Sequence, residues 1–245
     1  MENNKRIMKK VKIILAILIS LIVVLSAAFA IYVNIYYHAE NVDSYLTSDT
    51  NVTIEETSFG WFFDGPGNNE ALIFYPGAKV EACAYAPLMK MLSSQGIDCF
   101  LVKMPFNLAF FGINKADKIM NYYSYDKWYI SGHSLGGAMA ASYTAKHKDR
   151  LSGLVLLASY STGDLSDAAF PVLSIYGSND GVLNKDKVSS ARSLMPSAYS
   201  EYIIKGGNHA GFGSYGTQKG DNNADITNEE QWEITCEYIL KSLNR

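Results

Sequence analysis

The sequence predicts an α/β protein with a mostly parallel sheet flanked by helices, preceded by one N-terminal transmembrane helix. Apolar runs typical of buried strands alternate with helical segments from residue 51 to residue 243. A length of 245 residues suits one such domain with an appendage. The chain therefore divides into a basic flank (1–12), a transmembrane signal anchor (13–37), a linker (38–50) and the α/β domain (51–245).

The N-terminal segment predicts a single-pass membrane protein. Residues 13–33 form a run of 21 uncharged residues, long enough to cross a bilayer as a helix. Five cations and one anion precede it, and positive flanks stay in the cytoplasm, so we expect the α/β domain outside. Ala28-Phe29-Ala30 resembles a cleavage site, and the alternative is a protein secreted after processing near Ala30. Interfacial tyrosines after residue 31 favour the uncleaved anchor.

Charge and cysteine content exclude some functions. Without residues 1–12 the net charge changes from −3 to −7, and no basic run remains, which argues against nucleic-acid binding. An acidic exported part is also not expected to adhere to anionic lipid. Cys83 and Cys99 lie in apolar segments and are expected to be buried thiols, while a bridge between them stays open.

The elements follow in order from these patterns. Alternation over 51–58 predicts a half-exposed strand, and continuous apolar runs predict buried strands. The expected strands are 51–58, 71–75, 97–104, 127–131, 151–159, 171–176 and 199–204, and the expected helices are 81–95, 114–123, one after residue 134, 186–195 and 228–243. Residues 160–170 are too few for a sizeable lid over the carboxyl edge of the sheet.

One strand passes directly into a helix through Gly132-His133-Ser134-Leu135-Gly136, which fits the G-x-S-x-G nucleophile elbow. Such a reversal strains the backbone of the serine and leaves no room for side chains two positions away. Ser134 is therefore the expected nucleophile, presented at the positive end of a helix.

A serine nucleophile needs a base, and His209 is the expected one. It follows the last strand in a glycine-rich loop, whereas His147 lies roughly 20 Å along the elbow helix. Asp180, in a turn after a buried strand, is the expected acid, with Asp164 and Asp167 as alternatives.

Residues near the expected nucleophile are candidates for binding the oxyanion and the acyl group of a substrate. The backbone N–H groups of Leu135 and Ala78 are expected to form the oxyanion hole, with Lys79 as second choice to Ala78. Phe106, Phe110 and Phe111 are expected to line an apolar acyl pocket, unless they pack beneath the sheet. Tyr85 and Tyr215 are further pocket candidates with less support.

The chain resembles the α/β-hydrolase superfamily, and in particular the small bacterial family often called α/β-hydrolase fold-5, related to dienelactone-hydrolase-like proteins. The resemblance covers roughly residues 50–243 and is carried by 74–80, 102–109, 132–137 and 206–213. It implies the α/β-hydrolase fold and a serine hydrolase with no metal or organic cofactor. Dienelactone hydrolases use a cysteine nucleophile, so Ser134 argues against a dienelactone substrate.

These residues predict a serine hydrolase that cleaves carboxylic esters through an acyl-enzyme. An acyltransferase, a thioesterase or an amidase would use the same three side chains. A non-catalytic surface protein that binds through the same fold is the alternative from another class.

Overall fold

The computed structural model describes residues 2–67 and 69–243, which fall into two units, residues 1–36 and 37–245. The first unit is helix α1 (Glu2–Asn34), which by length and composition is able to cross a membrane. A cleavable signal sequence has the same length and composition. The remainder of the fold lies in the second unit.

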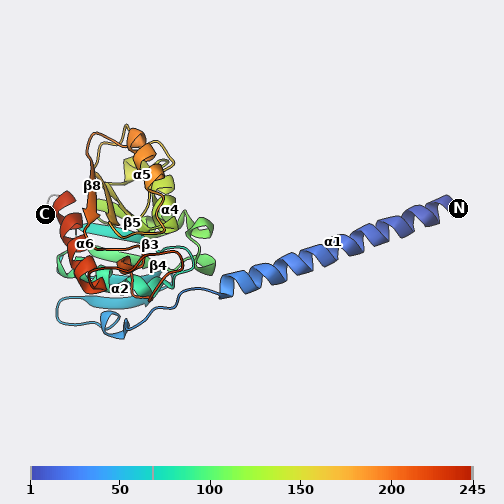
Figure 1. The fold of residues 1–245 in the computed structure, drawn as a ribbon, viewed down its shortest axis with the longest axis horizontal. Coiled ribbons are helices and arrows are strands. Elements are labelled where there is room, and N and C mark those ends of the chain that lie inside the picture. Colours follow the sequence, from blue (N-terminus) through green and yellow to red (C-terminus); the bar gives the residue numbers. More distant parts are fainter. Residues whose placement is uncertain (1, 68, 244–245) are drawn as a thin grey trace. The chain divides into compact units, whose positions relative to one another are not determined.

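The second unit is built on an eight-stranded sheet with the order β1-β2-β4-β3-β5-β6-β7-β8 (Figure 1). Its strands are β1 (Thr53–Thr57), β2 (Gly60–Asp64), β3 (Glu70–Tyr75), β4 (Asp98–Val102), β5 (Lys127–His133), β6 (Gly153–Leu157), β7 (Val172–Gly177) and β8 (Tyr199–Ile204). Strand β2 pairs antiparallel with β1 and β4, and every other pair is parallel. The mostly parallel sheet predicted from the apolar runs is confirmed.

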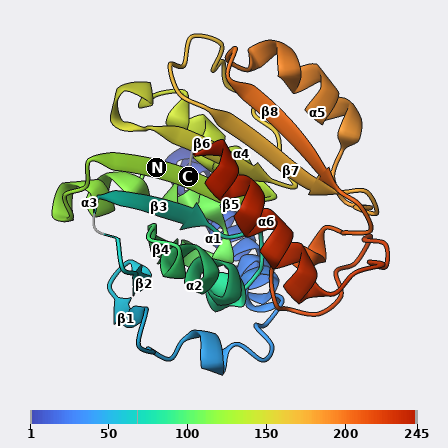
Figure 2. The ribbon, with the colours of Figure 1, turned by 90° about the vertical axis from the view of Figure 1, so that its left-hand side faces the viewer.

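Helices cover both faces of this sheet. They are α2 (Ala86–Ser94), α3 (Lys115–Tyr122), α4 (Leu135–Thr144), α5 (Lys185–Ala191) and α6 (Asn228–Ser242). Helices α2 and α6 lie together on one face (Figure 2), and their apolar side chains share a core with that face. Helices α3 and α4 pack into a second core on the other face. Strands β3, β4, β6 and β7 are therefore buried almost throughout.

The connection between β6 and β7 is short. No helix or strand is described between Leu157 and Val172, and the segment runs in bends and turns. The carboxyl edge of the sheet therefore carries no inserted lid at this connection.

Tyr37, the last residue of the expected anchor, and Glu40, in the expected linker, are both hydrogen-bonded to the rest of the domain. The Tyr37 N–H donates to the Lys79 carbonyl at 2.7 Å, and the Glu81 N–H donates to the Tyr37 carbonyl at 2.9 Å. Farther along, the Glu40 N–H donates to the Ser214 carbonyl at 2.8 Å. The chain is thus fixed to the domain from Tyr37 onward, which apolar periodicity gave no means to predict.

Strands β7 and β8 are joined outside the core by one carboxylate. Glu201 accepts hydrogen bonds from Arg192 Nε and Nη2 at 2.8 and 2.7 Å, from the Tyr176 hydroxyl at 2.8 Å and from the Tyr199 hydroxyl at 3.0 Å. The bonds from Arg192 are the main cause that lowers the pKa of Glu201 to about 2.

Glu201→Gln is expected to lower the free energy of unfolding by about 1–2 kcal/mol at pH 7. Because the pKa of Glu201 is lower in the folded chain, this stabilisation is complete above pH ~4.5 and disappears as the pH falls toward ~2. Denaturant unfolding of the full chain in detergent, followed by near-UV circular dichroism, measures the difference. Exposed Glu56→Gln is the control, and a difference that persists unchanged at low pH would contradict the assignment.

Candidate active site

The sharp turn between β5 and α4 holds Ser134 in an unusual backbone conformation, with φ +53° and ψ −122°. The Ser134 N–H donates to the Leu157 carbonyl at 2.9 Å, and the Ser159 hydroxyl donates to the Ser134 carbonyl at 2.8 Å. A Cβ at Gly136 would overlap the Tyr75 carbonyl, so only glycine lets α4 begin this close to β3. The strained serine is therefore held by β6 and the segment that follows it, while Gly136 packs against the end of β3.

His209 and Asp180 are in direct contact. His209 Nδ1 lies 2.8 Å from Asp180 Oδ2, and both side chains are almost completely buried. The other carboxylate oxygen, Asp180 Oδ1, accepts the N–H groups of Val182 and Leu183 at 2.9 and 2.7 Å. These two bonds fix the rotation of the carboxylate, so that Oδ2 faces the imidazole.

The loop that carries His209 is held by two residues that the sequence reasoning missed. Gln231, fully buried on α6, accepts the Asn208 N–H at 3.0 Å and donates to the Asn208 carbonyl at 2.9 Å. Asp221 accepts the Ala210 N–H at 2.8 Å and the Gly181 N–H at 3.0 Å. One carboxylate thus connects the turn after Asp180 to the turn after His209. Neither residue belongs to a local motif, and no sequence signal marked them.

Ser134 and His209 line the same small cavity at the carboxyl edge of the sheet. Its volume is about 250 Å³. The walls come from the start of α4, the end of β6 and the turn after Asp180: Ser134, Leu135, Ala138, Ala158, Ser159, Tyr160, Val182, Leu183, Asn184 and His209. His209 Nε2, the ring nitrogen not facing Asp180, is buried and has no hydrogen-bond partner among the described residues. The structure thus places Ser134 and His209 on one cavity and His209 against Asp180, with no hydrogen bond between the Ser134 hydroxyl and His209 Nε2.

The turn after β3 offers amides near the start of α4. The Lys79 N–H donates to the Asn107 carbonyl at 2.7 Å, so it is already engaged. Within the described ranges, no hydrogen bond is found for the N–H of Ala78 or for that of Leu135, the first residue of α4. Of the two choices for the turn after β3, Ala78 is therefore better placed to donate to an oxyanion than Lys79.

Tyr85 supports this turn and does not line the cavity. It is fully buried, where we expected a pocket residue. Its hydroxyl accepts the Gly77 N–H at 3.1 Å and shares a hydrogen bond with His133 Nδ1 at 2.7 Å. Burial, and next the nearby His209, lower the pKa of His133 well below its usual value. The ring centre of His133 is 4.5 Å from that of His209, which is why His209 adds to this lowering.

Tyr85→Phe is expected to lower the free energy of unfolding by about 1–3 kcal/mol, because the buried Gly77 N–H and His133 Nδ1 each lose a hydrogen-bond partner. Denaturant unfolding of the full chain in detergent measures the loss. Tyr122→Phe, at a side chain that is 75% exposed, is the matched control. Equal stability of the two variants would show that the buried hydroxyl does not hold the turn.

The phenylalanines lie away from the cavity. Phe106, Phe110 and Phe111 are 51%, 65% and 49% exposed, on the 3-10 turns Pro105–Asn107 and Ala109–Gly112. They neither line the cavity near Ser134 nor pack beneath the sheet. Tyr215 is buried, and its hydroxyl donates to Gln218. Loop residues have no periodicity from which these orientations follow.

The remaining candidates have other partners. Asp167 pairs with Lys148, and Asp164 Oδ1 accepts the Ser166 N–H at 2.9 Å. His147 stacks on Tyr143 at the far end of α4, with ring centres 4.1 Å apart. Cys83 and Cys99 are free, buried thiols.

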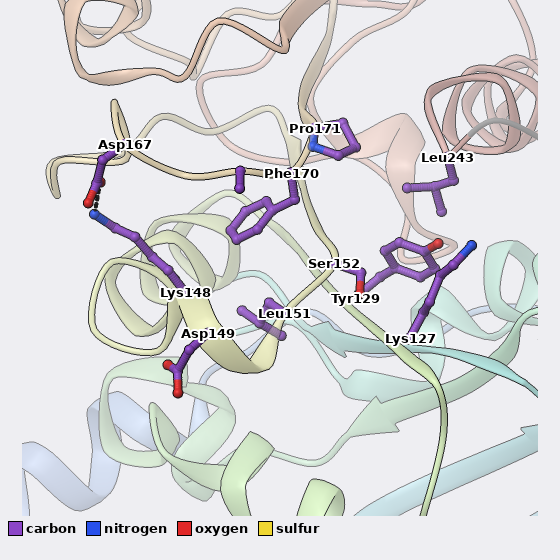
Figure 3. Close-up of a pocket in the computed structure, with 11 residues that line it drawn as sticks. Lys127, Tyr129, Lys148, Asp149, Leu151, Ser152, Asp167, Phe170, Pro171 and Leu243 are labelled. Carbon is purple, nitrogen blue, oxygen red and sulfur yellow. Dashed lines mark hydrogen bonds and ion pairs between the residues drawn. The ribbon is translucent and has the colours of Figure 1, made fainter.

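Larger cavities are found elsewhere in the domain. One of about 550 Å³ lies at the amino ends of β5, β6 and β7, opposite the edge that carries Ser134. Figure 3 shows Lys148 pointing at Asp167 on one side of it and Phe170 projecting between them and Tyr129. Its described lining includes no histidine to activate a nucleophile. Of these two cavities, only the smaller one is lined by both a serine and a histidine among the described residues.

Comparison with known proteins agrees with this geometry. The sequence profile of the Alpha/beta hydrolase family matches residues 71–233. No curated protein matches the chain in sequence.

Solved structures share the fold at low identity. Carboxylesterase CesB (YbfK) from Bacillus subtilis is 13% identical, with a TM-score of 0.57 over 82% of this chain and 94% of its own. Dienelactone hydrolase from Anabaena variabilis is 12% identical, with a TM-score of 0.61 over 78% of this chain and 99% of its own. A bacterial membrane phospholipase A is 11% identical, with a TM-score of 0.60 over 98% of this chain and 100% of its own.

Proposed function

Since the chain belongs to the alpha/beta hydrolase family, we propose that it is a serine hydrolase that cleaves carboxylic esters through an acyl-enzyme on Ser134. The observation that carries this proposal is the shared cavity of Ser134 and His209, together with the 2.8 Å contact between His209 Nδ1 and Asp180 Oδ2. Carboxylesterase and dienelactone hydrolase among the structural neighbours support the same class of reaction.

The reaction follows from the roles of the three side chains. His209 Nε2 takes the proton of the Ser134 hydroxyl as the serine oxygen attacks the ester carbonyl. The N–H groups of Ala78 and Leu135 stabilise the resulting oxyanion. The tetrahedral intermediate then expels the alcohol, which leaves with the proton from His209. Water, deprotonated by His209, attacks the acyl-enzyme. The bond between the acyl carbon and the Ser134 oxygen then breaks, His209 returns the proton to that oxygen, and the carboxylic acid is released.

We also propose that the domain is anchored outside the cytoplasm by α1. Support comes from the uncharged run of residues 13–33, the positive flank before it and the structural likeness to a membrane phospholipase A. Cleavage near Ala30 would instead release the domain, and the mass of the mature protein distinguishes the two.

A substrate panel tests the proposed reaction. The full chain in detergent is given p-nitrophenyl butyrate, the matching thioester and the matching anilide, and is labelled with a fluorophosphonate probe. We expect labelling and fastest turnover of the ester. A chain that neither reacts with the probe nor hydrolyses any of the three would be a binding protein with this fold. Faster turnover of the thioester or the anilide would replace esterase by thioesterase or amidase.

A further inference from the structure

The aromatic loop at residues 104–112 has no role in the proposed reaction. It nevertheless contacts two segments that have one, the turn after β3 and helix α4. Phe106, Phe110 and Phe111 form an exposed cluster on it, with ring centres 5.6 Å apart for Phe106–Phe111 and 5.5 Å apart for Phe110–Phe111. Single exposed apolar side chains are common, but a contiguous aromatic group marks an interaction site.

The backbone presents this cluster in a strained conformation. Phe106 and Asn107 have φ values of +57° and +53°, a region that non-glycine residues rarely adopt. The Asn107 carbonyl accepts the Lys79 N–H at 2.7 Å, and Ala109 is buried in the same core as Ala140 and Ala141 of α4. The loop is therefore fixed to the turn after β3 and to the helix that begins at Ser134.

Positive charge surrounds the base of the loop. Lys103 and Lys118 are exposed, and Lys115 Nζ donates to the Lys103 carbonyl at 2.6 Å. Partial burial, and then the charges of Lys118 and Lys103, lower the pKa of Lys115. Asp117, the neighbouring carboxylate, is paired with Arg150 at 2.7 Å. The patch is thus locally basic although the domain is acidic overall.

The turn after β3 is hydrogen-bonded to the first residue of the domain. Tyr37 exchanges backbone hydrogen bonds with Lys79 and Glu81, and only Ile35 and Tyr36 separate it from Asn34, the last residue of α1. Three residues of chain span at most about 11 Å. If α1 crosses a membrane, its covalent connection keeps the turn after β3 near the bilayer surface.

We propose that the aromatic loop and its lysines (the patch Lys103, Phe106, Phe110, Phe111, Lys115 and Lys118) rest on the anionic surface of the membrane in which α1 is embedded. Aromatic side chains favour the interfacial region, and each nearby lysine is attracted to anionic headgroups. The patch would set which side of the domain faces the lipid.

This orientation indicates the class of substrate, and that inference rests on the proposed function. In the sheet order, β4 and β3 lie on one side of β5, and β6 and β7 lie on the other. Besides α4 and His209, the segments that follow β6 and β7 line the cavity at Ser134. The aromatic loop instead follows β4. The acyl group would occupy the cavity, and the leaving alcohol would face the lipid surface. An acyl ester of a membrane lipid is the substrate that fits.

Lipid contact is tested directly by a fluorescent label. Phe110→Cys is labelled with an NBD maleimide in the full chain, reconstituted in vesicles of phosphatidylcholine and phosphatidylglycerol that contain a spin-labelled lipid. Burial raises the pKa of Cys83 and of Cys236 to about 11 and also raises that of Cys99, so the native thiols react poorly. Ile203→Cys, at a residue 49% exposed on β8, is the matched control.

We expect lipid quenching at position 110 at least about twice that at position 203. Equal quenching at the two positions would overturn the proposal. So would an emission shift at position 110 that appears in detergent with rising protein concentration and without lipid quenching, because a second copy of the chain would then cover the loop.

The lysines are tested by turnover. Lys103→Glu with Lys118→Glu is expected to lower hydrolysis of a lipid ester in the anionic vesicles about tenfold, while p-nitrophenyl butyrate turnover stays within about twofold. Lys146→Glu with Lys241→Glu carries the same charge change at exposed sites away from the patch and should affect neither. Equal lipid-ester turnover of the two double variants would overturn the proposal and leave the hydrolase assignment intact. Quenching at position 110 without hydrolysis of either ester would instead refute the proposed function alone.

Discussion

Replacement of Ser134 by alanine is expected to lower kcat for p-nitrophenyl butyrate by about 10⁴-fold or more and to abolish fluorophosphonate labelling. The variant retains the cavity and the amides of Ala78 and Leu135 but has no oxygen to form the acyl-enzyme. Alanine also fits the small volume of serine, so the fold should be unaffected. Steady-state hydrolysis and probe labelling of the full chain in detergent are the two measurements.

Ser193→Ala is the matched control for this variant. Ser193 is exposed in a 3-10 turn after α5, where its hydroxyl donates to the Ser190 carbonyl. We expect wild-type turnover and labelling from it. Labelling of Ser134→Ala at the wild-type level would show that another residue is the nucleophile, and the proposed mechanism would then be wrong.

Asp180→Asn is expected to lower kcat by about 10³–10⁴-fold with little change in fold. The carboxylate oxygen that accepts the Val182 and Leu183 N–H groups would remain as the amide oxygen, since only an oxygen can satisfy both donors. The amide nitrogen would then face His209 Nδ1 and force it to accept. His209 would carry its proton on Nε2, where it could not take the proton of Ser134.

The alternative acids supply the controls for this substitution. Asp164→Asn changes an exposed turn, and Asp167→Asn changes the partner of Lys148. We expect wild-type turnover from both variants. The pH dependence of kcat and the thermal stability of Asp180→Asn are measured alongside. A loss in either control that equals the loss in Asp180→Asn would transfer the acid role to the β6–β7 connection.

Local patterns made much of this architecture predictable. The elbow at Ser134 is readable because a strand, two glycines and a helix fall within a few residues, and the steric reason is local. The buried strands are readable because both of their faces are apolar. His209 and Asp180 follow from their positions after successive parallel strands, whose carboxyl ends meet at one edge of the sheet.

Long-range partners account for what could not be predicted. Tyr85 was a pocket candidate, but its hydroxyl contacts the Gly77 N–H and His133 Nδ1, and His133 is 48 residues away in the sequence. The three phenylalanines are exposed on a loop in which Phe106 and Asn107 have positive φ, and no side-chain pattern predicts that backbone. Tyr37, at the end of the expected anchor, and Glu40, in the expected linker at 38–50, are hydrogen-bonded to residues more than forty positions away.

The carboxylate of Asp221 has a consequence for motion. Because it holds the Gly181 and Ala210 amides at once, a displacement of either turn carries the other with it. Thermal fluctuations of this edge are therefore correlated, and the separation of the acid from the imidazole varies less than the separation of that pair from the serine. The distance between His209 and Ser134 would then change only when Asp180 and His209 move together relative to α4.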